Sequence, residues 1–267
     1  WNGLMVRSLA EAASVLKRDD YKEAAVNNAK FITQKLQRQG RLLRTFKDGH
    51  AKLNGYLEDY SFLIDGLLGV YELTFDAHWL DESRRLAKDM LELFWDEEDA
   101  VFYDPGIDHE SLIVRPREVF DNAIPSGSSV AAECLLKIAL VTGDMTYKRY
   151  SEAMIRSMSF LVPEMALGFG RWLCVLDLYY HRPKEIAIIG PKDHIDTINL
   201  LDAVNSIYLP DKILVLSEQE VENGSEISPL LGSKKRISGQ PTAFVCENYV
   251  CGLPVIDRDS LLDQLIK

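Results

Sequence analysis

The feature that most constrains this chain is a polar, glycine-bearing turn that leads directly into an apolar helix and occurs three times. The copies are Trp1-Asn2-Gly3 before residues 4–16, residues 54–60 before 61–75, and residues 125–129 before 130–141. A helix that is apolar nearly all round must be buried on several sides, so these three are predicted to be inner helices of a layered α-helical body. If they run in the same direction, their polar starts gather at one end. A common pocket there would be lined by helix N-termini, carboxylates, amides and hydroxyls.

Each predicted inner helix is followed by a more amphipathic one, at residues 21–36, 78–94 and 147–161. Charged side chains on one face of these segments indicate outer helices, so the sequence predicts three helical hairpins. A further helix is predicted from Pro163 to Tyr180, because proline is favoured in a first helical turn and Pro183 follows soon after its end. Long connections at 39–55 and 95–127 are expected to cover the pocket, with short strands at 42–46 and 101–103.

The pattern changes after Pro183. Segments 185–189 and 213–216 read as buried strands on either side of a helical segment, 194–207, which predicts a β-α-β unit. A further strand is expected at 242–246 and a last helix at 260–266. We therefore predict two domains, an α-helical region at 1–183 and a small α/β appendage at 184–267. The glycine patterns of dinucleotide and P-loop sites do not occur, which argues against nucleotide binding.

The balance of charges narrows the possible partners. Thirty Lys and Arg against 41 Asp and Glu give a formal net charge of −11, and no run of basic residues occurs. This argues against nucleic acid and a membrane as partners and favours a neutral or cationic small molecule. No apolar stretch approaches the roughly 18 residues that span a bilayer, and the first residues lack the pattern of a signal peptide, so a cytoplasmic location is predicted.

The four cysteines fall into two groups. Cys134 and Cys174 lie inside apolar helical segments, where we expect them to be inert core residues. Cys246 and Cys251 form one C-x4-C pair in a predicted strand and turn. A single pair is a weak metal or redox signal, since structural zinc normally takes four ligands, so a packing role is favoured. The sequence predicts no metal site and no cofactor.

Four ordered motifs carry a resemblance to a known family. They are Trp1-Asn2-Gly3-Leu4-Met5, Tyr56-Leu57-Glu58-Asp59-Tyr60, Asp121-Asn122-Ala123 with residues 125–132, and residues 243–248 with Cys251. Together they resemble the YyaL family of thioredoxin-domain-containing proteins. The resemblance implies a mainly α fold, a partial (α/α)6 toroid of the six-hairpin glycosidase-like type, with the small α/β appendage. It also implies a superfamily that includes glycosidases and sugar epimerases, without assigning a reaction.

Two departures from the family pattern bear on function. The family's proteins begin with a thioredoxin-like domain and enter the toroid before the Trp-Asn-Gly-Leu string. We therefore expect this chain to be the C-terminal part of such a protein, with part of the toroid outside it. The family usually has asparagine where this chain has Ser128, which weakens any role that needs an amide at this position.

The candidate catalytic residues are three carboxylates. Glu58 and Asp59 stand in the first turn of a predicted buried helix, where low dielectric and a like-charged neighbour raise one pKa. Asp121, from the long loop, supplies the further carboxyl that glycoside hydrolysis requires. The structural alternative is that Glu58 and Asp59 only favour the helix N-terminus, an effect of roughly 0.3–1 kcal/mol each.

Sugar sites need flat apolar faces as well as hydrogen-bonding groups. Each residue that could bind a sugar also has a structural alternative. For the aromatic and asparagine residues this is core packing, for Ser126 it is helix capping, and for Arg115 it is pinning of the loop by ion pairs. An epimerase-type mechanism would use histidine, and His50 and His109 are the loop histidines at the expected end. The candidate substrate-binding residues are Trp1, Asn2, Tyr56, Tyr60, Tyr103, Arg115, Asn122 and Ser126.

Two functional hypotheses follow. The first is a carbohydrate-active or carbohydrate-binding toroid protein with a carboxylate-lined pocket for a small-molecule, sugar-like ligand. The second is a non-catalytic scaffold or protein-binding module coupled to a thioredoxin-like domain. Geometry distinguishes them: the first predicts carboxyl groups on separate elements within about 5–10 Å of each other across an open pocket, and the second predicts that these groups are engaged in caps and ion pairs.

Overall fold

A computed structural model describes residues 1–111, 113–181, 183–221, 227–247 and 250–266 of the chain. The chain divides into two compact units, which are described separately. The first comprises Trp1–Leu136 and Met145–Leu176, and the second comprises Lys137–Asp144 and Asp177–Lys267. In the part of the chain that the structure describes, no helix has the length and apolarity needed to span a bilayer.

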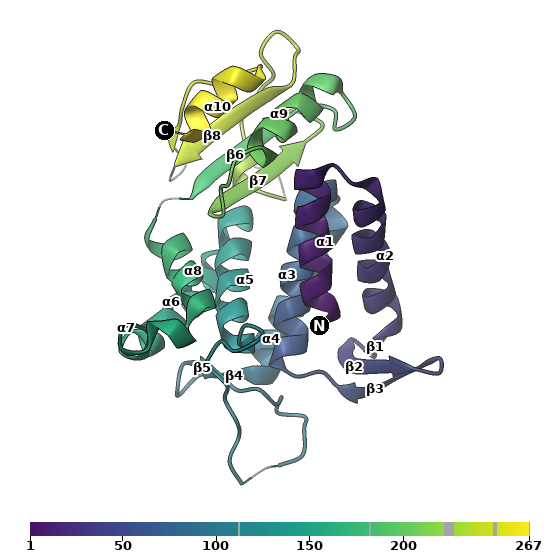
Figure 1. The fold of residues 1–267 in the computed structure, drawn as a ribbon, viewed down its shortest axis with the longest axis vertical. Helices are drawn as coiled ribbons and strands as arrows, with labels where there is room; N and C mark the ends of the chain where they lie inside the picture. The colour runs from purple at the N-terminus through teal and green to yellow at the C-terminus, as the bar shows by residue number, and fades with distance from the viewer. Residues whose placement is uncertain (112, 182, 222–226, 248–249, 267) are drawn as a thin grey trace. The chain divides into compact units, whose positions relative to one another are not determined.

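The first unit is built from helical hairpins, as predicted (Figure 1). Each hairpin pairs a predicted inner helix with an amphipathic outer one, so the mainly α fold inferred from the sequence is confirmed. The last residues of α5 belong to the second unit. The helices are α1 (Asn2–Leu16), α2 (Asp19–Lys35), α3 (Leu57–Thr74), α4 (Ala77–Phe94), α5 (Gly127–Thr142) and α6 (Met145–Met158).

Helix α3 is the centre of this unit, with every residue from Tyr60 to Tyr71 buried. Helix α1 packs against it very closely, because a Cβ atom at Gly66 would lie only 2.8 Å from the carbonyl oxygen of Gly3. Further along, Gly69 lies against Ala10, so the two helices run in the same direction. Helix α5 also starts beside the start of α3, where Gly127 abuts the backbone of Glu58. The condition stated for the inner helices, that they run in the same direction, is therefore met.

One expectation about α1 is wrong. Its apolar composition predicts burial on several sides, but only the face that carries Gly3, Val6, Ala10 and Ala13 is buried. Met5, Val15 and Leu16 are 54%, 59% and 61% exposed. Among the described residues of this unit, α1 packs mainly on α2 and α3, and its remaining apolar side chains are exposed.

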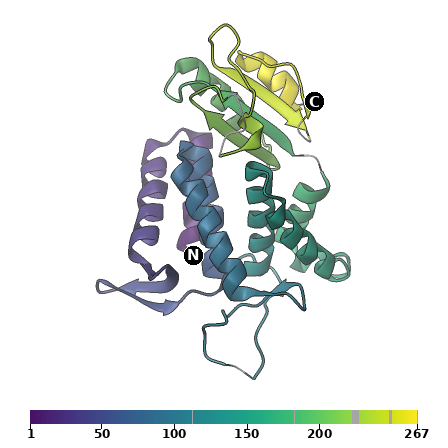
Figure 2. The ribbon, with the colours of Figure 1, turned by 180° about the vertical axis from the view of Figure 1, so that it is seen from behind.

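Short strands lie at the end of the unit where α3 and α5 begin (Figures 1 and 2). The strands predicted at 42–46 and 101–103 are present as β2 (Arg41–Lys47) and β5 (Val101–Phe102). Their antiparallel partners, which sequence reasoning did not identify, are β1 (Gln37–Arg38), β3 (His50–Asn54) and β4 (Trp95–Asp96).

The single helix predicted from Pro163 to Tyr180 is instead three pieces: α7 (Leu161–Glu164), the 3-10 turn η1 (Ala166–Gly168) and α8 (Gly170–Tyr180). The break has a tertiary cause. Asp121, from a distant loop, accepts a hydrogen bond from the Arg171 N–H at 2.7 Å, and its own N–H donates to the Gly168 carbonyl. This contact starts a new helix at Gly170, which local periodicity does not reveal.

The second unit contains a four-stranded sheet of β6 (Lys184–Ile189), β7 (Lys212–Ser217), β8 (Thr242–Glu247) and β9 (Val250–Cys251), in the order β7-β6-β8-β9. Strands β6 and β7 are parallel and joined through α9 (Ile195–Asn205), which confirms the predicted β-α-β unit. Helices α9 and α10 (Arg258–Ile266) lie side by side against the sheet. Asn248 of the fourth family motif lies outside the described residues.

The cysteines only partly match expectation. Cys134 is buried, as predicted, whereas Cys174 is exposed, because it lies on the open side of α8 and not in the core. Cys246 and Cys251 form a disulfide and not merely a packing contact, because they are direct cross-strand partners of β8 and β9. Cross-strand neighbours bring their Cβ atoms close enough to be bridged.

The close packing of α1 on α3 predicts a large effect of one added methyl group. Gly66→Ala places its Cβ against the Gly3 carbonyl and 3.1 Å from the Val6 Cβ. We expect it to lower the free energy of unfolding by about 1–3 kcal/mol through overpacking, despite the better helix propensity of alanine. Urea denaturation followed by circular dichroism measures this.

Gly170→Ala is the matched control, because a Cβ at Gly170 would meet no atom within 4 Å. It should be neutral or slightly stabilising. Equal stability of the two variants would contradict the close contact.

Candidate functional site

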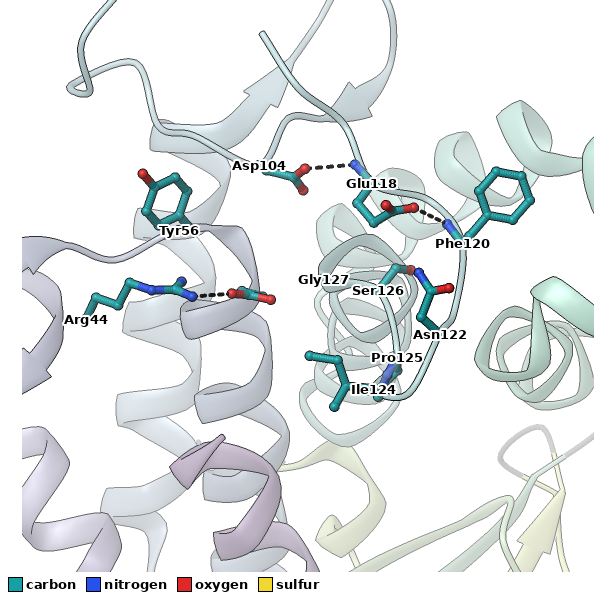
Figure 3. A pocket seen from close by; sticks show the side chains of 11 residues that line it. Arg44, Tyr56, Asp104, Glu118, Phe120, Asn122, Ile124, Pro125, Ser126 and Gly127 are labelled. Carbon is teal, nitrogen blue, oxygen red and sulfur yellow. Dashed lines mark hydrogen bonds and ion pairs between the residues drawn. The ribbon is translucent and has the colours of Figure 1, made fainter.

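A pocket of about 560 Å³ opens in the first unit where α3 and α5 begin (Figure 3). Its walls come from strand β2, the start of α3, the loop after β5 and the start of α5. Of the three predicted polar helix starts, those of α3 and α5 therefore gather around this pocket, whereas the start of α1 is not in its lining. The lining residues are Arg44, Tyr56, Glu58, Asp104, Glu118, Phe120, Asn122, Ile124, Pro125, Ser126 and Gly127.

The two helix starts lie close together because glycine stands at their contact. A Cβ atom at Gly127 would be 3.0 Å from the Glu58 nitrogen and 3.3 Å from the Leu57 side chain. The loop after β5 is attached at the same place, since the Leu57 N–H donates to the Asp104 carbonyl at 2.9 Å. The backbone of Asp104 is thereby fixed beside the start of α3.

Glu58 and Asp59 are both engaged by one arginine. Arg44, on β2, donates to Glu58 Oε1 at 2.7 Å and to Asp59 Oδ2 at 2.8 Å. Asp59 Oδ2 also accepts the Tyr56 N–H at 2.9 Å, as expected of a carboxylate in a first helical turn. Burial raises the pKa of Asp59, and the Tyr56 N–H and Arg44 partly offset this rise. Glu58 lines the pocket, whereas Asp59 does not.

Asp121 caps the starts of two helices, α5 and α8. Its Oδ1 accepts the Ser126 N–H at 2.8 Å and the Ser129 hydroxyl at 2.9 Å, at the start of α5. Its Oδ2 accepts the Arg171 N–H at the start of α8. Asp121 is not one of the pocket-lining residues, and these contacts are those of a structural carboxylate.

Asp104 is the pocket carboxylate that sequence reasoning missed. Burial raises its pKa to about 6, the charges of Glu118 and Glu58 add to the rise, and the Glu118 N–H and Arg117 oppose it. That N–H donates to Asp104 Oδ2 at 2.8 Å. The available signal was its position, directly after the predicted strand 101–103 and within the loop expected to cover the pocket.

Glu118 and Asn122 complete the polar lining from the same loop. Glu118 is exposed, and its Oε1 accepts the Phe120 N–H at 2.9 Å. Asn122 is exposed and lines the pocket, as predicted for a ligand-binding residue. The Phe120 ring, also in the lining, stacks on Phe169 with ring centroids 4.9 Å apart.

The three candidate tyrosines have different surroundings. Tyr56 lines the pocket, and the guanidinium of Arg44 lies 5.1 Å from its ring centroid. Tyr60 is fully buried, and its hydroxyl accepts the Leu42 N–H at 3.0 Å. Tyr103 donates to Asp99 at 2.7 Å and does not line the pocket.

The remaining candidates lie mostly outside the pocket. Trp1 is 83% exposed, and neither it nor Asn2 is among the lining residues. Arg115 donates to the Pro105 and Leu93 carbonyls, so it pins the loop. Ser126 does line the pocket, and its Oγ accepts the Ser129 N–H at 3.2 Å, which is the contact of a helix N-cap.

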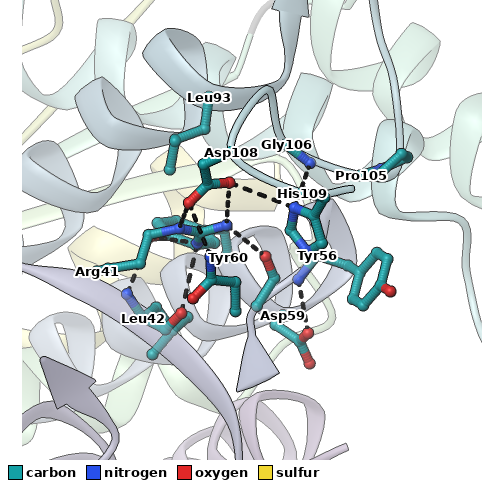
Figure 4. Close-up of polar contacts among 12 residues, drawn as sticks. Arg41, Leu42, Tyr56, Asp59, Tyr60, Leu93, Pro105, Gly106, Asp108 and His109 are labelled. Carbon is teal, nitrogen blue, oxygen red and sulfur yellow. Dashed lines mark hydrogen bonds and ion pairs between the residues drawn. The ribbon is translucent and has the colours of Figure 1, made fainter. Parts of the chain in front are cut away.

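A second polar cluster holds the loop onto the hairpin β2–β3 (Figure 4). Arg41 pairs with Asp108 at 2.7 and 3.1 Å and donates to the Tyr60 hydroxyl at 2.8 Å. His109 accepts the Gly106 N–H through Nδ1 at 3.0 Å, and its ring centroid lies 4.7 Å from that of Tyr56. His109 thus supports Tyr56 from outside the lining.

His50, the other histidine considered for an epimerase, lies in β3 and does not line the pocket. Among the described residues, no three or more His, Cys, Asp or Glu side chains are grouped so that they could hold a metal ion. The chemistry that the pocket offers is therefore that of carboxylates, one guanidinium, amide and hydroxyl groups, and aromatic rings.

Comparison with known proteins finds relatives by sequence. No family model matches the chain. It is 31% identical over 269 residues to spermatogenesis-associated protein 20 from Homo sapiens, an alignment that covers 96% of this chain and 34% of the human protein. The chain spans about a third of the length of the curated relatives that it matches. This similarity fits, in part, the family predicted from the motifs.

Two solved structures overlap with 58% of the chain and 42% of their own length. One is cellobiose 2-epimerase from Bacillus thermoamylovorans, with 17% identity and a TM-score of 0.49. The other is a GH76 α-mannanase from Bacteroides thetaiotaomicron, with 18% identity and a TM-score of 0.47.

The raised pKa of Asp104 predicts a pH-dependent effect of its replacement. Its folded pKa of about 6 exceeds the unfolded value of about 3.9, so stability falls as pH rises from about 4 through 6. Asp104→Asn removes the ionisable group and therefore this loss of stability at high pH. We expect the variant to exceed the parent in unfolding free energy by on the order of 1 kcal/mol at pH 8, and to match it at pH 4, in urea denaturation.

Asp108→Asn is a control for which the pH dependence of the stability difference should have the opposite sign. The hydrogen bonds from Arg41 lower the pKa of Asp108, so its contribution is present above the unfolded pKa and is lost as pH falls through the folded one. This variant should be less stable than the parent at pH 8, with a smaller difference near pH 3. If the stability differences of the two variants from the parent changed with pH in the same direction, the raised pKa of Asp104 would be refuted.

The capping contacts of Asp121 predict a structural effect. Asp121→Ala leaves the N–H groups of Ser126 and Arg171 without their acceptor, which should lower the unfolding free energy by about 1–3 kcal/mol. Asn122→Ala, at the neighbouring exposed position, should change it by about 0.5 kcal/mol or less. Thermal and urea denaturation test both, and unchanged stability of Asp121→Ala would show that its contacts are dispensable.

Proposed function

We propose that the pocket is a carbohydrate site and that the protein is carbohydrate-active, of a glycosidase- or epimerase-like kind. One observation carries the proposal: Asp104, with its pKa of about 6, shares an open pocket of about 560 Å³ with Glu58, Glu118 and the Tyr56 ring. These carboxyl groups come from two separate elements, Glu58 from the start of α3 and both Asp104 and Glu118 from the loop after β5, and their position around an open pocket supports the carbohydrate hypothesis.

The pocket suits a sugar in size and lining. Small-molecule pockets commonly measure about 300–1,000 Å³. Sugars present both hydroxyl groups and apolar ring faces, so their sites combine carboxylates and amides with aromatic rings. Glu58, Asn122, Tyr56 and Phe120 supply these groups around one opening.

In this proposal Asp104 is the residue that gives or takes the proton. A carboxyl group with a pKa near 6 exists in both protonation states close to neutral pH, as general acid–base catalysis requires. Glu118 or Glu58 supplies the second carboxylate, and their separation from Asp104 around the bound sugar sets the stereochemical outcome of hydrolysis. The contacts of Asp59 and Asp121 support structural roles at the helix starts, with Asp59 also orienting Arg44.

A second candidate function is a non-catalytic scaffold coupled to a thioredoxin-like domain. It is favoured by the engagement of Asp59 by Arg44 and the Tyr56 N–H, and of Asp121 by two helix starts. Under this alternative the pocket binds no sugar, and the carboxylates serve only the fold.

A thermal-shift and calorimetric titration with glucose, mannose, N-acetylglucosamine, glucosamine and cellobiose distinguishes the two. A bound sugar raises the melting temperature, since it stabilises the folded state by RT ln(1 + [L]/Kd). We expect Asp104→Asn and Glu118→Gln to weaken binding at least about 10-fold, which corresponds to 1.4 kcal/mol.

The control for this experiment is Asp81→Asn, at an exposed position on α4 outside the pocket. It should bind as the parent does. No shift with any sugar, from samples that remain folded, would favour the scaffold alternative.

A further inference from the structure

We infer that the pocket selects sugars that carry a free ammonium group, such as hexosamines, over neutral or anionic sugars. This inference rests on the proposed function, because it concerns the ligand class of the same site. It follows from how the charged groups around the pocket are paired.

The pocket lining carries more negative than positive charge. Three carboxylates, on Glu58, Asp104 and Glu118, line it together with one guanidinium, that of Arg44. A ligand that enters this pocket therefore meets a negative local field, whose strength increases as water is displaced.

The one guanidinium is already engaged. Arg44 donates to Glu58 at 2.7 Å through Nη2 and to Asp59 at 2.8 Å through Nη1. It is therefore shared between two carboxylates and has no charge left over for a ligand phosphate or carboxylate. Binding such an anion to Arg44 would require breaking one of these ion pairs.

Asp104 and Glu118 have no comparable partner. Among the described residues, the hydrogen bonds found for their carboxylates come from backbone N–H groups, those of Glu118 and Phe120, and neither forms an ion pair with a basic side chain. The charge of Arg117 lowers the pKa of Asp104 without an ion pair between the two side chains, and its Nη2 lies 3.9 Å from the Met158 sulfur. These two carboxylates are therefore available to an ammonium group.

The helix starts beside the pocket do not reverse this preference. A helix N-terminus favours anions through its free N–H groups. Here Asp59 and Asp121 already accept the N–H groups of Tyr56 and Ser126, next to α3 and α5. The chain's own carboxylates thus take up the N–H groups that directly precede the two helix starts.

The aromatic lining also suits a cation. Tyr56 and Phe120 are among the lining residues, with Arg44 already near the Tyr56 ring and one face of the Phe120 ring stacked on Phe169, and a desolvated ammonium is attracted to the electron-rich face of an aromatic ring. An ammonium group on a sugar could then pair with Asp104 or Glu118, while the hydroxyl groups use Asn122 and Glu58.

The test is isothermal titration calorimetry of the whole chain at pH 7 with four probes: glucosamine, glucose, N-acetylglucosamine and glucosamine 6-phosphate. Glucosamine should bind at least about 10-fold more tightly than glucose or N-acetylglucosamine, because only it pairs an ammonium with a free carboxylate. Glucosamine 6-phosphate should bind more weakly than glucosamine. The preference should decrease as salt rises from 50 to 500 mM.

Variants link the preference to the pocket. Glu118→Gln keeps the acceptor for the Phe120 N–H but removes the charge, so glucosamine should lose more affinity than glucose does, and most of its advantage over glucose should disappear. Glu92→Gln, an exposed glutamate on α4, is the matched control and should keep the full preference.

The outcomes separate the inference from the proposed function. Equal or tighter binding of glucose would overturn the ammonium preference and leave a carbohydrate site in place. Tightest binding of glucosamine 6-phosphate would overturn it in favour of an anion site. If Glu118→Gln and Asp104→Asn both bound glucosamine as tightly as the parent, the ammonium group would bind elsewhere and the inference would be overturned. If none of the four probes bound, both the inference and the proposed function would be overturned.

Discussion

The close approach of α3 to its two parallel neighbours depends on positions without side chains. At Gly66 the backbone of α1 comes within van der Waals contact of α3, and at Gly127 the start of α5 meets the backbone of Glu58. Because both contacts lie on helices that run in the same direction, the polar starts of α3 and α5 are held side by side. The pocket lies at this junction, so its geometry follows from helix packing and not from the loops alone.

The loop that covers the junction is held by buried and half-buried polar groups. Asp121 ties it to the starts of α5 and α8, and Arg41 ties its Asp108 region to β2 and α3. Each of these anchors satisfies several backbone or side-chain donors at once, which makes the loop a defined wall of the pocket. Asp104, between the anchors, is then held where burial and neighbouring charge raise its pKa to about 6.

The carboxylates around the site divide by their partners. Asp59 and Asp121 accept N–H groups next to helix starts, and Asp59 also shares Arg44 with Glu58. Asp104 and Glu118 accept only backbone N–H groups among the described residues and face the opening. The first pair thus stabilises the helix starts, whereas the second pair has no basic partner among the described residues, which is the observation behind the proposed ligand site.

The helical hairpins and the β-α-β unit follow from the amino-acid sequence alone, because hydrophobic period and glycine-bearing turns are local signals. The common direction of the inner helices was only a condition at that level, and the contacts of Gly66 and Gly127 establish it. The sequence also located the pocket at the helix starts and included Tyr56, Glu58, Asn122 and Ser126 in its lining. Only the tertiary structure decided that α8 begins at Gly170, that α1 keeps an exposed apolar face, and that Asp104 joins the pocket while Asp121 serves as a cap. Each of these features depends on a contact between residues distant in the chain. Neither periodicity nor composition predicts which distant donor will form a hydrogen bond with a given carboxylate.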